Sequence, residues 1–526
     1  MRVIVLLLLA LGCGPACTAA AEDWPMLQHD PQRTGRSKVS VVVGNRARWV
    51  WVDEQTVTRD FDSKVGNSIQ YARPRNVILA GDVQPIVAEN KVFFGAVNGE
   101  FHALDGETGR TVWKRTLGGA VVHTAAYAEQ TVVTGCLDGN LYGLAAADGG
   151  VRWAFKAEAG FSTAPLLQDG VAYATSRDGH LYAVDLKSGK LVWKYRNLAE
   201  TPEHPFSGAP IFQSPASDGK LIFFGAENMY FYAVDAQSGK EAWRRPLGGS
   251  SFMFTWPVVH QGLVMTYVMV PCGLSEYVLE KEFDALPNRE KAESPLDFAR
   301  RVWPQERTVI REWLRKNPHY RNFYVMKATD GKDAFAEDVP MGRVGGFGYP
   351  GRAPVVDGKD RILTYWRTKS ATFLSGTGTF GTKYVPDVGI LDPKSGDRVF
   401  LEKPSPPNMC ELDNNYLLTV GGDWLYGNNH MRGAKMMNLN GGPSVTISAI
   451  LANWDGGNFR GWGVKLIWFS NEKDGKFHPF PSIHASPQGE SGVVPALVKG
   501  KPMLFFQESG HYQINFGCLS AVEGNP

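Results

Sequence analysis

Five polar side chains that could contact a ligand share one place in the chain, in loops that follow a strand ending a recurring unit. They are His123, His204, Arg343, Asn408 and Glu490, with Phe252 and Phe254 as aromatic neighbours and His430 and Asp455 as further candidates. Imidazole, guanidinium, amide and carboxylate groups could hydrogen-bond a polar ligand or hold a charged one. Their spacing matches no catalytic motif. For each side chain taken alone, we favour a solvated or locally hydrogen-bonded role over ligand contact.

The unit that positions these loops is clearest in residues 178–194, DGHLYAVDLKSGKLVWK. Asp178-Gly179 predicts a two-residue hairpin turn, because this dipeptide readily adopts the positive φ angles that such turns require. The stretch HLYAVD then alternates as a strand with both faces partly covered. In the next turn we expect Asp185 to accept backbone N–H bonds and Gly189 to adopt the left-handed conformation.

The unit returns along the chain, and a tryptophan marks it each time. The distances between successive tryptophans are 40, 40 and 50 residues, a period typical of repeat architectures whose units pack against one another. We expect these residues to pack between units and not to bind substrate: Trp113, Trp153, Trp193 and Trp243. Aspartates also recur at one place in the unit, where capping the turn accounts for them. These aspartates, not assigned to catalysis, are Asp105, Asp185, Asp235 and Asp392.

The two chain ends complete each other. RARWVWV at residues 46–52 matches the last strand of a unit, and FGCLSAVEG at 516–524 matches the strand before it. If Trp49 and Trp51 lie beside the strand near Leu519, the array closes into a ring and removes the exposed edges of an open array. The sequence therefore predicts a β-propeller.

The sequence contains eight such units, counting the one divided between the chain ends. It therefore predicts an all-β fold, an eight-bladed β-propeller of four-stranded antiparallel blades. Seven blades is the alternative if the weakly matching residues 404–448 are not a blade. Residues 22–526 would form the propeller. Trp24–Gly35, which is punctuated by proline and glycine, is expected to lie as an irregular segment over the surface.

Three long inserts interrupt the later units, at residues 273–321, 367–386 and about 447–488. The first carries a helix signal, because Ser294 can act as N-cap with Pro295 at the first helical position. Its basic residues between 300 and 316 could face an anionic partner, but a solvated helix surface is the favoured interpretation. In an up-and-down blade, the loops between strands two and three share a face with the loops between blades. All three inserts are therefore expected to crowd one mouth of the channel.

Composition and the N-terminus bear on location and partners. A formal net charge of +2 and the lack of a Lys/Arg run argue against nucleic acid as a partner. Residues 1–21 have the outline of a secretory signal peptide, so we expect export to the periplasm or cell surface. Ala19-Ala20-Ala21 offers an ordinary cleavage site, while Leu11-Gly12-Cys13 is similar to part of a lipobox. A lipid anchor there would be the one expected link to a membrane.

Four cysteines follow the signal region: Cys136, Cys272, Cys410 and Cys518. Export permits disulfides, yet these residues fall in separate units and have no CxxC spacing. Buried free thiols are the favoured interpretation, with disulfides as the alternative.

The repeat A-[LV]-D-x-x-[ST]-G-x-x-x-W resembles the tryptophan-docking repeat of the quinoprotein-like propellers. It is present at residues 103–113, 183–193 and 233–243. Eight-bladed members of this superfamily include pyrroloquinoline quinone (PQQ) dependent alcohol dehydrogenases and a non-catalytic lipoprotein of the outer-membrane β-barrel assembly machinery. The resemblance is strong between residues 80 and 245 and looser beyond, and it specifies the blade more than the function.

The dehydrogenases of this superfamily imply PQQ in the channel, a calcium ion and an Asp base, often with a vicinal cysteine pair. This sequence has no Cys-Cys and no CxxCH, and no catalytic residue can be carried over by motif. We therefore expect no cofactor and no metal. The preferred hypothesis is an exported, monomeric binding or scaffolding module for protein partners in the cell envelope. The alternative is a PQQ- and calcium-dependent alcohol or sugar dehydrogenase.

Overall fold

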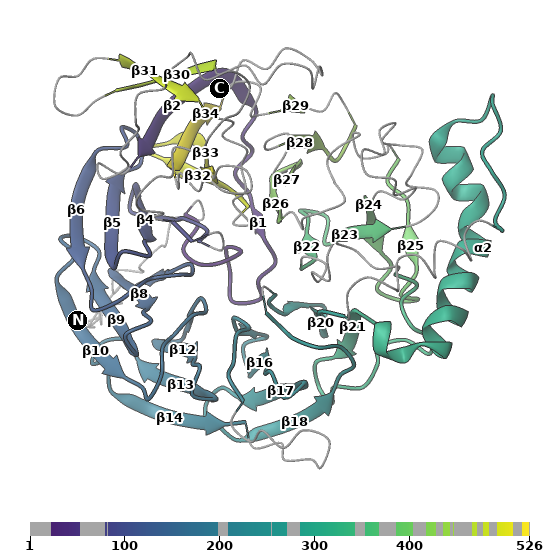
Figure 1. Cartoon of the computed structure of the whole chain (residues 1–526), viewed down its shortest axis with the longest axis horizontal. Coiled ribbons are helices and arrows are strands. Elements are labelled where there is room, and N and C mark those ends of the chain that lie inside the picture. The colour runs from purple at the N-terminus through teal and green to yellow at the C-terminus, as the bar shows by residue number, and fades with distance from the viewer. Residues whose placement is uncertain are drawn as a thin grey trace, which may run out of the picture.

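Eight β-sheets stand around a central axis in the computed structural model of the chain (Figure 1). The structure describes residues 23–52, 79–80, 83–197, 209–253, 255–270, 285–341, 353–367, 386–402, 417–427, 435–441, 445–446, 465–470, 477–482, 492–508 and 518–524. The predicted eight-bladed propeller is confirmed, and the seven-bladed alternative is wrong.

Blades 1 to 4 follow one another along the chain, and in each the strands run outward from the axis in sequence order. Blade 1 contains β3 (Ile86–Ala88), β4 (Lys91–Gly95), β5 (Glu100–Asp105) and β6 (Thr111–Thr116). Blade 2 contains β7 (Ala126–Ala128), β8 (Thr131–Gly135), β9 (Asn140–Ala145) and β10 (Val151–Lys156). Blade 3 contains β11 (Leu166–Gln168), β12 (Val171–Thr175), β13 (His180–Asp185) and β14 (Leu191–Arg196). Blade 4 contains β15 (Ala216–Ser217), β16 (Leu221–Gly225), β17 (Tyr230–Asp235) and β18 (Glu241–Pro246).

Blades 5 to 7 depart from this plan. Blade 5 contains β19 (Val258–His260), β20 (Leu263–Tyr267) and β21 (Phe323–Lys327), and its fourth strand is reduced to a bridge between Met326 and Asp333. Blade 6 contains β22 (Val355–Val356), β23 (Ile362–Arg367), β24 (Pro386–Leu391) and β25 (Arg398–Val399). Blade 7 contains β26 (Leu418–Gly421), β27 (Trp424–Gly427), β28 (Lys435–Asn438) and β29 (Val445–Thr446), with β1 (Arg36–Ser37) parallel to β26.

Blade 8 closes the ring as predicted. It consists of β32 (Val493–Val498), β33 (Lys501–Glu508), β34 (Cys518–Gly524) and, outermost, β2 (Val43–Val52) from the other end of the chain. Trp49 pairs with Ala521, and Trp51 pairs with Leu519. The antiparallel ladder between the first and last strands therefore joins the ends of the array.

The turn chemistry follows the repeat, with one correction. Ser188 donates its backbone N–H to Asp185 at 2.8 Å, and Gly189 has φ 68°, as expected. The hairpin at Asp178-Gly179 is longer than the two residues predicted, because Gly179 N bonds Ser176 O and Ser176 N bonds His180 O. This arrangement gives a three-residue loop with the left-handed glycine last, which the same dipeptide also favours.

Each repeat tryptophan meets the neighbouring blade. The indole N–H donates to a backbone carbonyl of that blade at 2.8–3.1 Å, in the pairs Trp49–Gly106, Trp113–Ala146, Trp153–Leu186, Trp193–Ala236 and Trp243–Ala328. The turn glycine of the next blade lies under the ring: a Cβ on Gly189 would be 2.5 Å from Trp153 Cβ. The glycine is thus required for its positive φ and for this close approach.

The first insert forms a helix, α2 (Pro295–Lys316), followed by η1 (Pro318–Tyr320). Ser294 Oγ accepts from Asp297 N, so the predicted N-cap is confirmed. For residues 285–321, the described part of this insert, the expectation that it crowds the channel mouth is wrong, because α2 lies at the circumference beside blade 6 (Figure 1). There Trp303 Nε1 donates to Asp397 Oδ1 at 3.0 Å and Trp303 packs edge-on against Phe400. Its apolar stripe requires an apolar surface, and blade 6 supplies one.

The basic residues of α2 are partly engaged by the protein itself. Arg301 pairs with Glu293 at 2.7 Å, Arg307 pairs with Asp397, and Arg311 pairs with Glu337 at 2.7 Å. These pairs support a helix surface that is neutralised by the protein or solvated. In the third insert, β30 (Lys465–Ser470) and β31 (Phe477–Ser482) form a hairpin near β2 at the edge of the ring (Figure 1). Residues 368–385 of the second insert lie outside the described residues.

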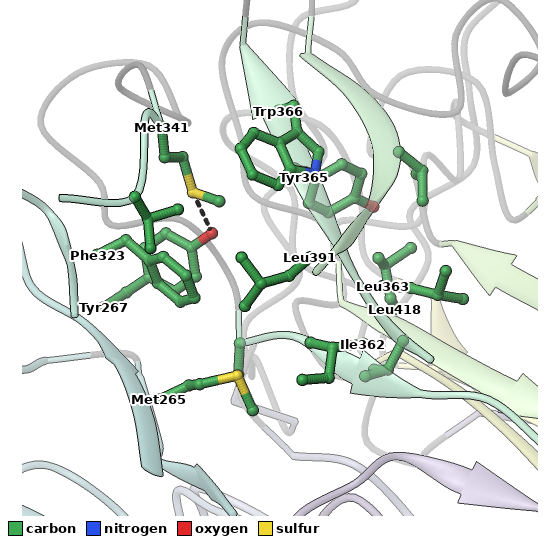
Figure 2. Packing of buried hydrophobic residues seen from close by; sticks show 14 of the residues in the cluster. Met265, Tyr267, Phe323, Met341, Ile362, Leu363, Tyr365, Trp366, Leu391 and Leu418 are labelled. Atoms are coloured by element: carbon green, nitrogen blue, oxygen red, sulfur yellow. Dashed lines mark hydrogen bonds between the residues drawn. The ribbon is translucent and has the colours of Figure 1, made fainter. Parts of the chain in front are cut away.

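A large shared core lies between blades 5, 6 and 7 (Figure 2). Tyr267 of β20 donates its hydroxyl to Met341 Sδ at 2.8 Å and lies 3.0 Å from Thr364 Oγ1. Burial raises the pKa of this phenol. Cys136 is buried and free, in keeping with its predicted role, and the side chains of the other three cysteines lie outside the described residues. Within the described ranges, no helix combines the length and apolar character that crossing a membrane requires.

Candidate functional site

The channel segment, residues 24–35, runs along the inner strands of the ring and crosses its centre (Figure 1). The prediction that it lies over the surface is wrong. Its backbone hydrogen-bonds the innermost strands of six blades, in the pairs Trp24–Val87, Pro25–Tyr127, Pro31–Ser217, Gln32–Val259, Thr34–Val356 and Gly35–Val420. An irregular segment can cross the interior because the inner strands satisfy its backbone groups.

The conformation of the channel segment requires unusual backbone angles. Gln28, His29 and Arg33 have φ values of 55°, 75° and 60°. Asp30 stabilises the turn between them by accepting the backbone N–H of Thr34 at 3.0 Å. Non-glycine residues in this region are strained, and such strain persists where the surrounding contacts determine the conformation. Here those contacts come from the ring.

Arg33 is the charged anchor of the channel segment. It is completely buried, and its guanidinium donates to the carbonyls of Leu27 at 2.7 Å, Pro215 at 3.0 Å and Pro165 at 3.1 Å. Burial lowers its pKa to about 9, against a smaller raising effect of Asp30. At neutral pH the side chain stays charged and bridges blades 3 and 4.

Gln84, just before the innermost strand of blade 1, binds the start of the channel segment. Its Oε1 accepts from Trp24 Nε1 at 3.0 Å and from Gln28 N at 2.9 Å. Its backbone N–H donates to Thr124 Oγ1 of blade 2 at 2.8 Å. All of these side chains are buried, and Gln84 Oε1 holds the start of the channel segment, while Gln84 Nε2 and Gln28 Oε1 are buried with no hydrogen-bond partner among the described residues.

His123 lies next to this cluster, half-buried between blades 2 and 4. Its Nδ1 accepts from Thr124 N at 2.8 Å, and its Nε2 lies 3.5 Å from Ser214 Oγ. Since Nδ1 is an acceptor, a neutral ring must carry its proton on Nε2. Nε2 therefore faces the serine as a donor and cannot remove the Ser214 proton, so the pair lacks the polarity of a nucleophile and its base.

The place of His123 in the repeat indicates its role. His123, Thr163, Gln213 and Thr255 each stand three residues before an innermost strand. Thr163 Oγ1 lies 2.8 Å from Thr175 Oγ1. Gln213 Nε2 donates to Thr255 Oγ1 at 2.6 Å and to Thr266 Oγ1 at 3.0 Å. At this position the neighbouring blades use polar side chains to join strands and blades.

Of the other candidates from the sequence, the structure describes Phe252 alone. His204, Arg343, Asn408 and Glu490, with Phe254, His430 and Asp455, lie outside the described residues. Phe252 is buried against Phe231, and its N–H donates to Glu227 Oε1 at 3.0 Å. Burial raises the pKa of Glu227. Arg33 and Gln84 were not identified from the sequence. For Arg33 the available signal was the polar stretch HDPQRTG at residues 29–35, which was assigned to the surface.

The described residues around the channel segment can be compared with the ligands that a calcium ion beside PQQ would need. Across the part of the chain that the structure describes, His, Cys, Asp and Glu side chains do not gather in groups of three or more that could hold a metal. Asp30 is the one carboxylate of the channel segment, and it accepts a hydrogen bond from Thr34, whereas calcium requires about six to eight oxygen ligands, commonly several of them carboxylates. Among the described residues there is therefore no recognisable set of calcium ligands.

Comparison with known proteins supports the assignment of the repeat. The family described as outer membrane protein assembly factor BamB matches residues 50–134 and 98–252. BamB of Burkholderia pseudomallei is 23% identical over 163 residues, which cover 31% of this chain and 42% of that protein. The 1-butanol dehydrogenase (quinone) of Thauera butanivorans is 31% identical over 90 residues, which cover 17% of this chain and 14% of that enzyme. The matches thus span less than half of these relatives.

Solved structures show the same fold over nearly the whole chain. A europium-containing methanol dehydrogenase has a TM-score of 0.55 at 11% identity, covering 96% of this chain and 98% of that one. A quinohemoprotein alcohol dehydrogenase from Comamonas testosteroni has a TM-score of 0.54 at 12% identity, covering 97% and 82%. At such identities the likeness concerns the fold alone. Residues 50–252 are thus similar to the BamB repeat family, and the whole chain has the eight-bladed fold of the PQQ-like β-propellers.

Proposed function

We propose that this propeller is an exported binding or scaffolding module for protein partners in the cell envelope. The observation that carries the proposal is the channel segment, which crosses the centre of the ring and is held there by Arg33, bonded to carbonyls of blades 3 and 4, and by Gln84 Oε1. Recognition is then left to the outer surface of the ring. The match to BamB, named as an outer membrane protein assembly factor, supports a partner among envelope proteins.

Export and anchoring belong to the same proposal. Residues 1–21 would direct the chain to the periplasm or cell surface, with cleavage after Ala21 or lipidation at Cys13. Mass spectrometry of the purified mature protein separates the two, since lipidation leaves an acylated N-terminal cysteine. An unprocessed N-terminus in the native host would contradict export.

The recognition surface that we propose joins the insert-bearing face of the ring to the outer wall beside α2. Hydrogen bonds from Leu137 N to Ala120 O and from Val121 N to Ala96 O bring the loops between blades next to those between strands two and three. On the same insert, Arg300 and Arg315 of α2 are exposed. A partner could therefore contact these loops and the polar side of the helix together.

Affinity purification from the envelope tests this surface. Deleting residues 273–321 should remove a partner that the full chain retains. Because the deletion uncovers the apolar contacts of Trp303, the double variant Arg300→Glu/Arg315→Glu serves as a matched change that leaves the helix packed. A partner list identical for all three proteins would contradict the proposed surface.

The dehydrogenase function is the second candidate, favoured by the match to the quinone-dependent 1-butanol dehydrogenase. It is tested by adding PQQ and calcium to the purified protein, then measuring bound metal, the absorbance of bound cofactor and dye-linked oxidation of alcohols and sugars. We expect no stoichiometric uptake. Stoichiometric uptake with turnover would replace the scaffold proposal.

A further inference from the structure

The outer strand of blade 3 differs from the outer strands of its neighbours in how its cations are used. Each of the four outer strands β6, β10, β14 and β18 carries two basic residues. In three of them the protein pairs these cations: Lys114–Glu100, Arg115–Gly149 O, Arg152–Thr131, Lys156–Asp138 O, Arg244–Glu241 and Arg245–Asp333. Lys194 and Arg196 of β14 have no such partner among the described residues.

Asp178, at the turn before β13 of blade 3, is already engaged. Lys194 stands opposite Tyr182 and Arg196 opposite His180 in the ladder with β13. Asp178 accepts the Tyr182 hydroxyl at 2.8 Å and lies 3.1 Å from His180 Nδ1. Its side chain is 6% exposed. Among the described residues, the two exposed cations therefore have no counter-charge of their own.

The same strand exposes apolar surface. Leu191 and Val192 are 45% and 51% exposed, and Val192 is the most exposed of the large apolar side chains in the described residues. The exposed positions 192, 194 and 196 alternate with Trp193 and Tyr195, which pack toward blade 4. One face of β14 thus presents an apolar residue followed by two cations at the two-residue spacing of a strand.

The backbone of β14 can accept another strand. It is the outermost strand of blade 3, and no described strand pairs with its outer edge. An edge strand offers unpaired N–H and C=O groups to an extended peptide, while side-chain pairs across the new ladder select the sequence. Lysine at an edge discourages self-association, but it favours a partner of opposite charge.

We propose that β14 is a docking edge for an extended acidic segment of a partner protein, which adds to blade 3 as a fifth strand. Two carboxylates two residues apart would lie opposite Lys194 and Arg196, and an apolar residue would cover Val192. The inference rests on the proposed function only in taking the partner to be a protein. This edge is separate from the insert at residues 273–321.

The test uses the full chain and a short labelled peptide in which two glutamates and one valine alternate with threonines, followed by fluorescence anisotropy. The double variant Lys194→Glu/Arg196→Glu should weaken binding at least about tenfold, since two attractive cross-strand pairs become repulsive. The matched variant Arg152→Glu/Lys156→Glu makes the same charge change on β10 and should alter binding by less than about twofold. Thermal unfolding of both variants establishes that they are folded.

Further measurements establish whether the peptide binds as an added strand. A peptide N-methylated on the edge facing β14 should not bind, because the ladder hydrogen bonds are removed. Equal losses for the β14 and β10 variants would overturn the proposal, as would binding only to anionic phosphatidylglycerol vesicles. Deletion of residues 273–321 should leave peptide binding unchanged, so failure of the proposed recognition surface and failure of this edge give different results.

Discussion

Blades 1 to 4 and blades 5 to 7 are held together by different parts of the sequence. In the first group a repeated tryptophan of one blade packs on the turn glycine of the next, as Trp153 does on Gly189. In the second group Phe335 takes the place of a tryptophan against Gly396, and α2 adds Trp303 against Trp366 and Phe400. Where the repeat weakens, inserted structure supplies the buried aromatic surface that the blades still require.

The channel segment is common to both groups, so breaking it should have the largest effect. Arg33→Ala is expected to lower the free energy of unfolding by about 3–5 kcal/mol, since three buried carbonyls lose a charged donor. Urea unfolding followed by tryptophan fluorescence measures the change. Arg36→Ala is the control, because Arg36 makes a partly exposed pair with Asp360 and should cost at most about 1 kcal/mol. Similar small losses for both variants would contradict an anchoring role.

Removing one tryptophan from each group of blades should show that the repeat tryptophan stabilises the ring, whereas the tryptophan of the insert stabilises the packing of α2. Trp153→Ala is expected to cost about 3–4 kcal/mol, because it empties a buried site between blades 2 and 3 and leaves Leu186 O without its donor. Trp303→Ala should instead loosen α2 while the blades persist. Hydrogen exchange distinguishes the outcomes, and loss of protection throughout the ring for both variants would refute the difference.

The seam between blade 8 and blade 1 should carry a pH dependence. His102 is 3% exposed, packed against Trp51 and Phe94, and burial lowers its pKa from 6.5 to about 4, partly opposed by Glu100. The unfolded state then binds more protons than the folded state between these values, so stability falls as the pH drops from 6.5 towards 4. The full loss is about 3 kcal/mol.

His102→Phe keeps an aromatic ring in the seam and should remove most of this dependence. Denaturant unfolding of the two proteins at pH 7, 5.5 and 4.5 measures it. If both proteins lose stability in parallel, other groups are responsible, and His102 is not the origin of the effect.

The smallest effect should come from the docking glycine. Gly189→Ala places a Cβ 2.5 Å from Trp153 Cβ at φ 68°, whereas Gly262→Ala meets no atom within 4 Å at φ 74°. Both substitutions carry the cost of a positive φ, about 1 kcal/mol, so the difference isolates the close approach. We expect Gly189→Ala to cost about 1–2 kcal/mol more in thermal unfolding. If both variants lost the same free energy of unfolding, the blades would have to shift apart without cost, and the close approach would not contribute to stability.

Most of the fold could be predicted because the same strand pattern, turn residues and tryptophan recur in several units of the sequence. Turn aspartates, turn glycines and tryptophans are local or next-neighbour signals, and Trp49 opposite Ala521 followed from one incomplete unit at each end. The site was less accessible. Four of its five candidates, His204, Arg343, Asn408 and Glu490, lie outside the described residues, and His123 stands where other blades place structural hydrogen bonds.

The sequence by itself determined the blade, the ring and its closure, since period, turn chemistry and strand pattern act over short distances that a single chain displays directly. Only the tertiary structure decided that Trp24–Gly35 crosses the centre of the ring and that α2 lies on the outer wall. The physical reason is that both segments are stabilised by groups distant in the sequence. Pro165 and Pro215 receive Arg33, and Asp397 receives Trp303, although nothing in the local sequence marks these partners.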